Sequence, residues 1–168
     1  SGAALPFIIY FSKNCRSEGA AIGVMAAETF LLTNGITNIT KSIAKRYRPF
    51  NYNPEVDDAI KLGCGSRLSF FSGHVSNTAA MSFFAAKVLT DLHPDMENKY
   101  LVWATAATIP AVISYLRYEA GKHFPTDLIT GYVVGATIGY LIPTLHLSKD
   151  VNLQFSGGSG FDIRISLN

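Results

Sequence analysis

The sequence predicts an all-α chain that ends in a short β-hairpin. Helices are expected because four apolar runs have helical length and composition: 20–45, 74–89, 100–118 and 126–145. The last twenty residues differ, since apolar and polar side chains alternate on both sides of the Gly-rich stretch 157–160. A period of two around a glycine turn is typical of two paired strands. We therefore predict a helical domain over 1–148 and a hairpin tail over 149–168.

Local signals indicate where these helices begin and end. Pro49 ends the first helix, because proline disfavours helical backbone in the residue that precedes it. Ser72 is expected at the N-cap of the second helix, and residues 50–71 before it predict a long, ordered loop. Near the N-terminus, the apolar run 5–11 is consistent with either a strand or a partial helix.

The composition leaves open both a soluble and a membrane-associated protein. Charged residues make up 15% of the chain, below the usual quarter, and the mean hydropathy is +0.21. The runs 100–116 and 128–145 approach the ~20 apolar residues that span a membrane, although the core helices of a bundle have the same pattern. A net charge of +2 predicts no nucleic-acid partner.

Two clusters of residues suggest an anion site. Lys41 and Arg48 are seven residues apart, so two helical turns place both cations on nearly one helix face. The second cluster, Ser72-Gly73-His74, begins a helix, where free N–H groups attract anions and His74 could donate a proton. The alternatives are a solvated basic helix end for the first cluster and an ordinary helix cap for the second.

A third cluster, Arg117, His123 and Asp127, surrounds a bend between two apolar helices. Gly121 and Pro125 interrupt the helix, so that His123 turns back towards the other clusters. A carboxylate hydrogen-bonded to Nδ1 would leave Nε2 free to attack, so we predict that His123 is a nucleophile oriented by Asp127. The alternative is a His–Asp pair that only stabilises the bend.

Together the three clusters predict a phosphoryl-transfer site that uses no metal. The charge of the phosphoryl oxygens would be shared by three cations and by donors at a helix start: Lys41, Arg48, Arg117, Ser72 and Gly73. The sequence contains no Cys/His spacing typical of a metal site. Cys15 and Cys64 are equally consistent with one disulfide and with two free thiols.

The ordered pattern Lys-x6-Arg-Pro, Ser-Gly-His and Arg-x5-His-x3-Asp resembles the type 2 phosphatidic-acid phosphatase superfamily. That superfamily also includes bacterial non-specific acid phosphatases and vanadium haloperoxidases. The resemblance covers roughly residues 20–145 and implies a helical bundle of the acid phosphatase/haloperoxidase type. Two positions depart from the pattern, with Phe71 where the family usually has proline and Leu116 where it usually has serine.

The resemblance also implies a role for each site residue and a phospho-histidine intermediate. His123 would be the nucleophile, Asp127 its orienting partner and His74 the general acid. The phosphate would be held by the five remaining residues of the motifs: Lys41, Arg48, Ser72, Gly73 and Arg117.

We therefore predict a metal-independent phosphatase, with no cofactor, that hydrolyses phosphate monoesters. A lipid phosphate, an isoprenoid diphosphate and a small soluble phosphate are all compatible with this prediction, and residues 50–71 are expected to decide between them. There, Phe50, Tyr52, Phe70 and Phe71 either line an apolar entrance or pack the loop down. The alternatives are a vanadate-dependent haloperoxidase and a non-catalytic module that binds anions or lipids. The expected location is the bacterial periplasm, or a membrane with the site facing the periplasm.

Overall fold

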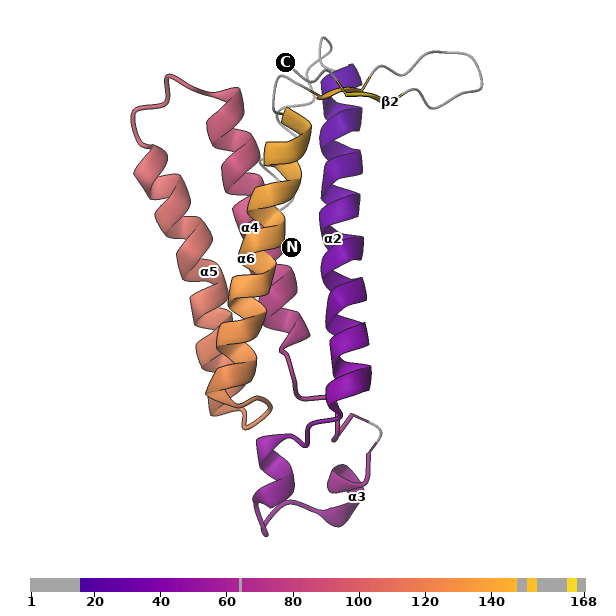
Figure 1. The fold of residues 1–168 in the computed structure, drawn as a ribbon. Helices are drawn as coiled ribbons and strands as arrows, with labels where there is room; N and C mark the ends of the chain where they lie inside the picture. Colours follow the sequence, from indigo (N-terminus) through magenta and orange to yellow (C-terminus); the bar gives the residue numbers. More distant parts are fainter. Residues whose placement is uncertain (1–15, 64, 148–150, 154–162, 166–168) are drawn as a thin grey trace.

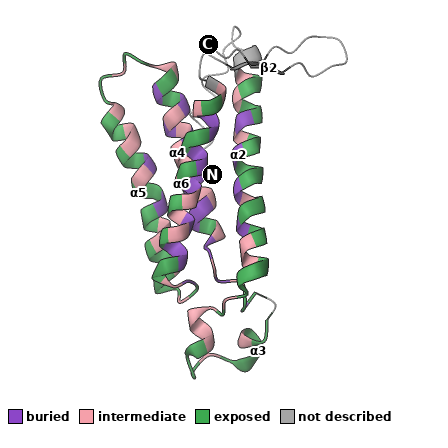
Figure 2. Cartoon of the chain, viewed as in Figure 1, coloured by how far each residue is buried: buried purple, intermediate pink, exposed green. Residues whose placement is uncertain are grey.

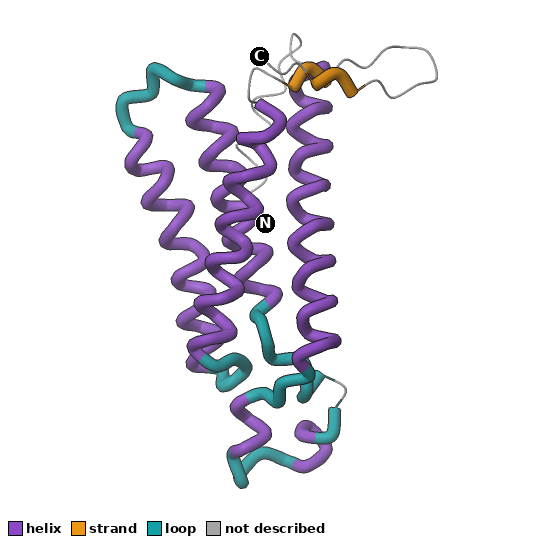
Figure 3. The backbone as a smooth tube through the Cα atoms, viewed as in Figure 1, coloured by secondary structure: helices purple, strands orange, loops and turns teal. Residues whose placement is uncertain are grey.

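The computed structural model describes residues 16–63, 65–147, 151–153 and 163–165. Four long helices, α2, α4, α5 and α6, dominate these residues, and Figures 1 and 3 show their arrangement. In chain order, the helices and strands are α2 (Arg16–Ala44), η2 (Pro49–Tyr52), α3 (Asp58–Lys61), α4 (Gly73–Leu92), α5 (Lys99–Glu119), α6 (Pro125–Leu147), β1 (Val151–Leu153) and β2 (Ile163–Ile165).

The four long helices run side by side, with α4 and α6 between α2 on one side and α5 on the other (Figure 1). Successive helices alternate in direction. The C-terminal ends of α2 and α5 therefore meet the N-terminal ends of α4 and α6 at one end of the bundle, and the short helices η2 and α3 lie beyond it. Each of the three predicted residue clusters belongs to this end.

Helices α4 and α6 approach each other closely because α6 has glycine at every fourth position. A Cβ atom added to Gly135 or Gly139 would lie 2.1 Å from the backbone oxygen of Ser76 or Ala80. At Gly131, one turn nearer the site, an added Cβ would also meet α4 backbone, at 2.8 Å. Small residues at this spacing allow two helix backbones to contact directly, as is common in membrane bundles.

The apolar core lies between α2, α4 and α6. It contains the buried side chains of Met25, Phe84, Val88, Ile138 and Ile142. In Figure 2 the buried residues of α2 face inwards, towards α4 and α6. Towards the site the core becomes more polar.

A stripe of threonines marks this polar part of α2. Thr29, Thr33 and Thr37 are buried one turn apart. Two of them satisfy their hydroxyls on α2 itself, since Thr33 Oγ1 donates to the carbonyl of Thr29 at 2.7 Å and Thr29 Oγ1 to that of Met25 at 2.8 Å. Thr37 instead pairs with Ser76 Oγ of α4 at 3.1 Å. Lys41 follows one turn later, so the stripe leads to the predicted anion site.

The outer surface of the bundle carries many large apolar side chains. Leu31 and Ile43 of α2, Tyr115 of α5 and Ile129 and Leu145 of α6 are all more than half exposed. By length and composition, Gly19–Tyr52 and Pro125–His146 are long and apolar enough to cross a membrane.

The predicted helical bundle is confirmed, and two parts of the prediction need correction. The first helix is not ended by Pro49: it ends at Ala44, and Arg48 follows in extended backbone before η2, so Lys41 and Arg48 do not share a helix face.

Residues 50–71 are not a plain loop, because they contain most of η2 and all of α3. Asp57 begins α3 by accepting a hydrogen bond from Ala59 N at 2.9 Å, a side-chain cap that is local in sequence.

At the other end of the chain, β1 and β2 pair antiparallel, with Val151 opposite Ile165. The turn expected between them lies outside the described residues, so the hairpin tail stays a prediction. The run 5–11, Cys15 and Cys64 also lie outside the described residues.

Candidate active site

The predicted site residues come from three segments that meet at one end of the bundle. Lys41 is in the last turn of α2, which ends where Lys45 takes a left-handed conformation with φ of 42°. A Cβ atom on Gly73 would lie 3.2 Å from Lys41 Nζ, so the absence of a side chain there lets the lysine reach the start of α4. The backbone N–H of Ser72 donates to the Asp127 carbonyl at 3.0 Å and thereby joins α4 to α6.

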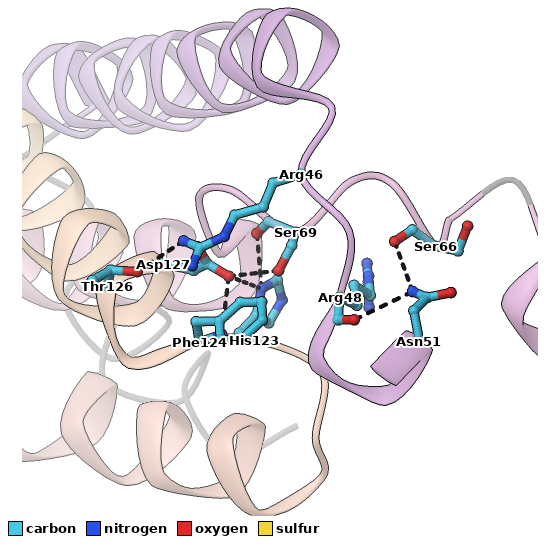
Figure 4. A network of polar contacts seen from close by, with 9 residues as sticks. All are labelled: Arg46, Arg48, Asn51, Ser66, Ser69, His123, Phe124, Thr126 and Asp127. Carbon is cyan, nitrogen blue, oxygen red and sulfur yellow. Dashed lines mark hydrogen bonds and ion pairs between the residues drawn. The ribbon is translucent and has the colours of Figure 1, made fainter. Parts of the chain in front are cut away.

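His123 is held in one tautomer by a backbone group. The ring is 3% exposed, and Nδ1 lies 2.9 Å from the carbonyl oxygen of Ser69 (Figure 4). A carbonyl oxygen only accepts hydrogen bonds, so the proton is on Nδ1 and the lone pair is on Nε2. This is the state that a histidine nucleophile requires.

The predicted hydrogen bond from His123 Nδ1 to Asp127 is not present, because Nδ1 donates to the Ser69 carbonyl instead. Asp127 Oδ2 lies 3.7 Å from Nδ1, too far for a good hydrogen bond. The fully buried carboxylate instead accepts from Ser69 Oγ at 2.5 Å, from Arg46 Nη1 at 2.6 Å and from Phe124 N at 3.0 Å. Asp127 therefore holds the segments on both sides of His123 rather than the ring itself.

Arg46 is a site residue that the sequence analysis did not identify. Besides Asp127, its Nη1 contacts Thr126 Oγ1 at 2.8 Å, and its guanidinium lies 4.2 Å from the centre of the Phe124 ring (Figure 4). Its backbone oxygen accepts from Ser69 N at 3.0 Å. Arg46 and Asp127 are 81 positions apart, so no local spacing pointed to this contact.

The residues predicted to hold the phosphate, here called the phosphate cradle, are Lys41, Arg48, Ser72, Gly73 and Arg117. Two polar atoms of this cradle are buried without a hydrogen-bond partner in the described part of the chain. They are Ser72 Oγ and Arg48 Nε. Ser72 occupies the predicted N-cap position of α4, but its hydroxyl makes no capping bond. Buried polar groups are normally hydrogen-bonded, so both atoms are available to a ligand, and an anion at a helix N-terminus is the ligand that would suit them.

The electrostatics of the site keep His123 neutral. Burial, together with the nearby charge of Arg48, lowers the pKa of His123 to about 4, although its contacts with Ser69 and Asp127 act in the opposite direction. His74 is more exposed, and partial desolvation and the positive charge of Arg117 also lower its pKa. At neutral pH, His123 is therefore unprotonated and able to act as a nucleophile.

A pocket of about 450 Å³ adjoins Arg48 on the side of η2 and α3. Phe50, one of the aromatic residues predicted at an entrance, lines it. Phe71 is only 2% exposed and packs edge-to-face against Phe70, so it belongs to the interior instead. Tyr52 is 71% exposed and contacts Phe124 edge-on.

No group of three or more potential metal ligands occurs among the described residues. Metal independence nevertheless stays a prediction, since only an assay in chelator would test it.

One protein-family model and several individual proteins match this chain. The model of the PAP2 superfamily matches residues 22–150. A lipid A 4'-phosphatase from Porphyromonas gingivalis is 25% identical, over 86% of this chain and 58% of that protein. A PA-phosphatase related-family protein from Dictyostelium discoideum is 32% identical, over 81% of this chain and 53% of that protein. This chain thus spans between half and three fifths of the length of these two relatives.

A solved structure has the same fold. It is a transmembrane PAP2-type phosphatidylglycerolphosphate phosphatase from Bacillus subtilis, which superposes with a TM-score of 0.61 at 23% identity. The match covers 87% of this chain and 66% of that one.

Proposed function

Because the chain belongs to the PAP2 superfamily, we propose that it is a phosphatase that hydrolyses lipid phosphate esters through a phospho-histidine intermediate. The observation that carries the proposal is the pair of partnerless buried atoms, Ser72 Oγ and Arg48 Nε. They belong to the same end of the bundle as a neutral His123 whose Nε2 carries the lone pair. A phosphoryl group is an anion that would satisfy both atoms and would also be attacked by Nε2.

In the first step, Nε2 of His123 forms a bond to phosphorus while the bond from phosphorus to the ester oxygen breaks. His74 gives a proton to the departing oxygen, as a general acid. The charge on the remaining phosphoryl oxygens is stabilised by fixed cations and donors, namely Lys41, Arg48, Arg117, Ser72 and Gly73.

In the second step, water attacks the phospho-histidine. His74, now neutral, takes a proton from the water as the bond between nitrogen and phosphorus breaks, and inorganic phosphate is released. The hydrogen bond from Nδ1 to the Ser69 carbonyl stabilises the positive charge that the ring carries while it is phosphorylated. The route needs neither a metal nor a cofactor.

The lipid substrate is proposed from two observations. Relatives of this chain are named as phosphatases of lipid A, of decaprenylphosphoryl-5-phosphoribose and of phosphatidylglycerophosphate. In this chain, α2 and α6 are long and apolar enough to span a membrane, and large apolar side chains cover the outside of the bundle. We place the site at one membrane surface, where a lipid headgroup would reach it.

We also propose that the site faces the periplasm of a bacterial cell. Protease added to intact spheroplasts should then cleave within residues 49–63. Protection in spheroplasts, with cleavage in inverted vesicles, would show the opposite orientation.

The test is phosphate release from phosphatidic acid in mixed micelles containing EDTA. His123→Ala should abolish it, whereas the matched variant His93→Ala, at the other end of α4, should not. Rapid acid-free quenching with radiolabelled substrate should trap label on the wild type and on His93→Ala, but not on His123→Ala.

Three results would count against parts of the proposal. Normal turnover by His123→Ala would exclude the nucleophile assignment, and loss of activity in EDTA would exclude metal independence. A preference for soluble phosphates over phosphatidic acid would exclude the lipid substrate. Halide peroxidation that appears only with added vanadate would instead identify a haloperoxidase.

A further inference from the structure

The pocket beside the phosphate cradle contains a second cation and apolar side chains that have no role in the hydrolysis of a simple monoester. It measures about 450 Å³ and shares Arg48 with the cradle. Its other side chains include one further cation, three apolar groups and one hydroxyl: Lys122, Phe50, Val56, Ile60 and Ser66. None of the described residues that line it carries a carboxylate. The volume lies in the range of ~300–1,000 Å³ that is typical of small-molecule sites.

Backbone hydrogen bonds hold the walls of this pocket together. Arg48 N donates to the carbonyl of Ser66 at 2.9 Å, which ties the end of the α2 connection to the segment before α4. Phe50 N donates to the carbonyl of Gly121 at 3.2 Å, which ties η2 to the bend between α5 and α6. Lys122 follows Gly121 directly, so its position relative to Arg48 is set by this second bond.

Lys122 lines the pocket together with Arg48, one of the predicted phosphate-binding residues. It precedes His123 in the chain, and its positive charge is one of those that lower the pKa of His74. In the proposed mechanism His74 protonates the leaving oxygen. A cation near both His74 and Arg48 is therefore placed to attract negative charge on the leaving group, whereas a neutral leaving group would offer it no partner.

We propose that Lys122 and Arg48 form a second anion subsite, which binds a phosphate group carried by the leaving group of the substrate. The inference rests on the proposed phosphatase function and narrows its substrate class to esters with two phosphate groups. Arg48 then contacts both groups, because it lines the pocket and also belongs to the cradle. The apolar side chains of the pocket contact the carbon skeleton next to the second phosphate.

For a diphosphate the chemistry balances without another reactant. Nε2 of His123 bonds to the terminal phosphorus, and the bond from that phosphorus to the bridging oxygen breaks. The electron pair stays on the bridging oxygen, which takes a proton from His74. The leaving group is a monophosphate, held by Lys122, and water then releases inorganic phosphate from His123.

The experiment compares two substrates that differ by one phosphate, geranyl phosphate and geranyl diphosphate, in the same detergent. The quantity measured is the ratio of their kcat/KM values. In Lys122→Met the ratio should shift about tenfold against the diphosphate. That size lies between the small effect of an exposed ion pair and the larger effect of a buried charged hydrogen bond. Lys122→Arg should restore the preference for the diphosphate. High salt should weaken this preference in the wild type, because it screens the charge of Lys122.

Lys61→Met is the matched control. Lys61 is on α3 beside the pocket, where it lies 3.6 Å from Asp58 Oδ1, but it is not part of the pocket lining. Its removal takes away the same charge from the same region and should leave the ratio unchanged. A ratio unaltered in Lys122→Met, or altered equally in both variants, would overturn the subsite.

A binding measurement separates failure of the subsite from failure of the proposed function. Methylenediphosphonate and methylphosphonate carry two groups and one group, and neither is hydrolysed. By calorimetry, Lys122→Met should lose about tenfold in the preference for the diphosphonate. If no phosphate ester is turned over but this loss is observed, the proposed function is wrong and the subsite stands. If esters are turned over and the preference does not change, the subsite is wrong and the function stands.

Discussion

Asp127→Asn distinguishes a carboxylate that orients the nucleophile directly from one that holds the backbone around it. In the first case Asp127 would fix the tautomer of His123. In the structure, Nδ1 is bound by the Ser69 carbonyl at 2.9 Å, and the carboxylate is 3.7 Å away. The substitution keeps the size of the side chain and changes its charge and one of its acceptors.

The cost in stability follows from the three donors that surround the fully buried carboxylate. An amide keeps one acceptor oxygen, and its NH₂ group must face a donor on the other side. The charge pair with Arg46 is also lost, but solvent screens that pair because the arginine side chain is 37% exposed. We therefore expect the free energy of unfolding to fall by about 2–3 kcal/mol, below the ~3–5 kcal/mol of breaking a fully buried pair.

The cost in catalysis should be moderate. The Ser69 carbonyl still accepts from Nδ1, so the tautomer of His123 is retained and only its position becomes less constrained. A fall in kcat of about ten- to thirtyfold, or ~1.4–2 kcal/mol, is the expected result. Where a carboxylate itself holds the tautomer, the same substitution lowers kcat by about 10⁴.

The assay measures urea unfolding and kcat on one preparation of each variant. Asp91→Asn serves as the control, because it removes an ion pair with Lys87 at 2.6 Å at the end of α4 away from the site. It should change neither quantity noticeably. If Asp127→Asn unfolds like the wild type but loses about 10⁴ in kcat, the carboxylate orients the ring directly and the reasoning is refuted.

Three further predictions concern packing, pH and the end of α2. Gly135→Ala should lower stability by roughly 1–3 kcal/mol and reduce activity, because the new methyl group would lie 2.1 Å from an α4 carbonyl. Gly23→Ala, which meets nothing within 4 Å, should raise stability slightly, and thermal unfolding compares the two. The profile of kcat/KM should rise with pH as His123 loses its proton near a pKa of about 4, and fall as His74 loses its proton at a pKa below 6.5, so an optimum at neutral or alkaline pH would contradict the assigned roles. Lys45→Gly should stabilise the protein by a few tenths of a kcal/mol, since glycine adopts φ of 42° without strain, and an unchanged or lower unfolding midpoint would argue against it.

The parts of the site that could be predicted from the sequence are those encoded by short spacings. Lys41 and Arg48 were expected on one face at a helix end, and Ser72 was expected to begin a helix. The second feature is present, because a helix start depends on local residues such as serine. The first is only half right: Lys41 lies in the last turn of α2, but α2 ends at Ala44 and Arg48 follows in extended backbone, so the two cations do not share a helix face. The order of the motifs then placed these ends together, since antiparallel neighbours in a bundle bring alternate helix ends to one side.

The parts that could not be predicted depend on contacts between distant segments. Ser69 contacts Asp127 across 58 positions and His123 across 54, and neither spacing leaves a local pattern. The sequence analysis therefore paired His123 with the nearest carboxylate, four residues away. The folded chain brings a backbone carbonyl closer to Nδ1 than that carboxylate.

This arrangement makes the nucleophile dependent on the assembly of three segments rather than on one motif. The backbone oxygen of Arg46 binds Ser69 N, its guanidinium binds Asp127, and both Ser69 and Asp127 adjoin His123. Arg46 thus connects the end of α2 to the segment before α4 and to the start of α6. Arg46→Met should then move His123 without touching it, leaving an uncompensated buried carboxylate and lower activity even with soluble aryl phosphates. If that variant keeps full activity while its stability falls, the network serves the fold alone.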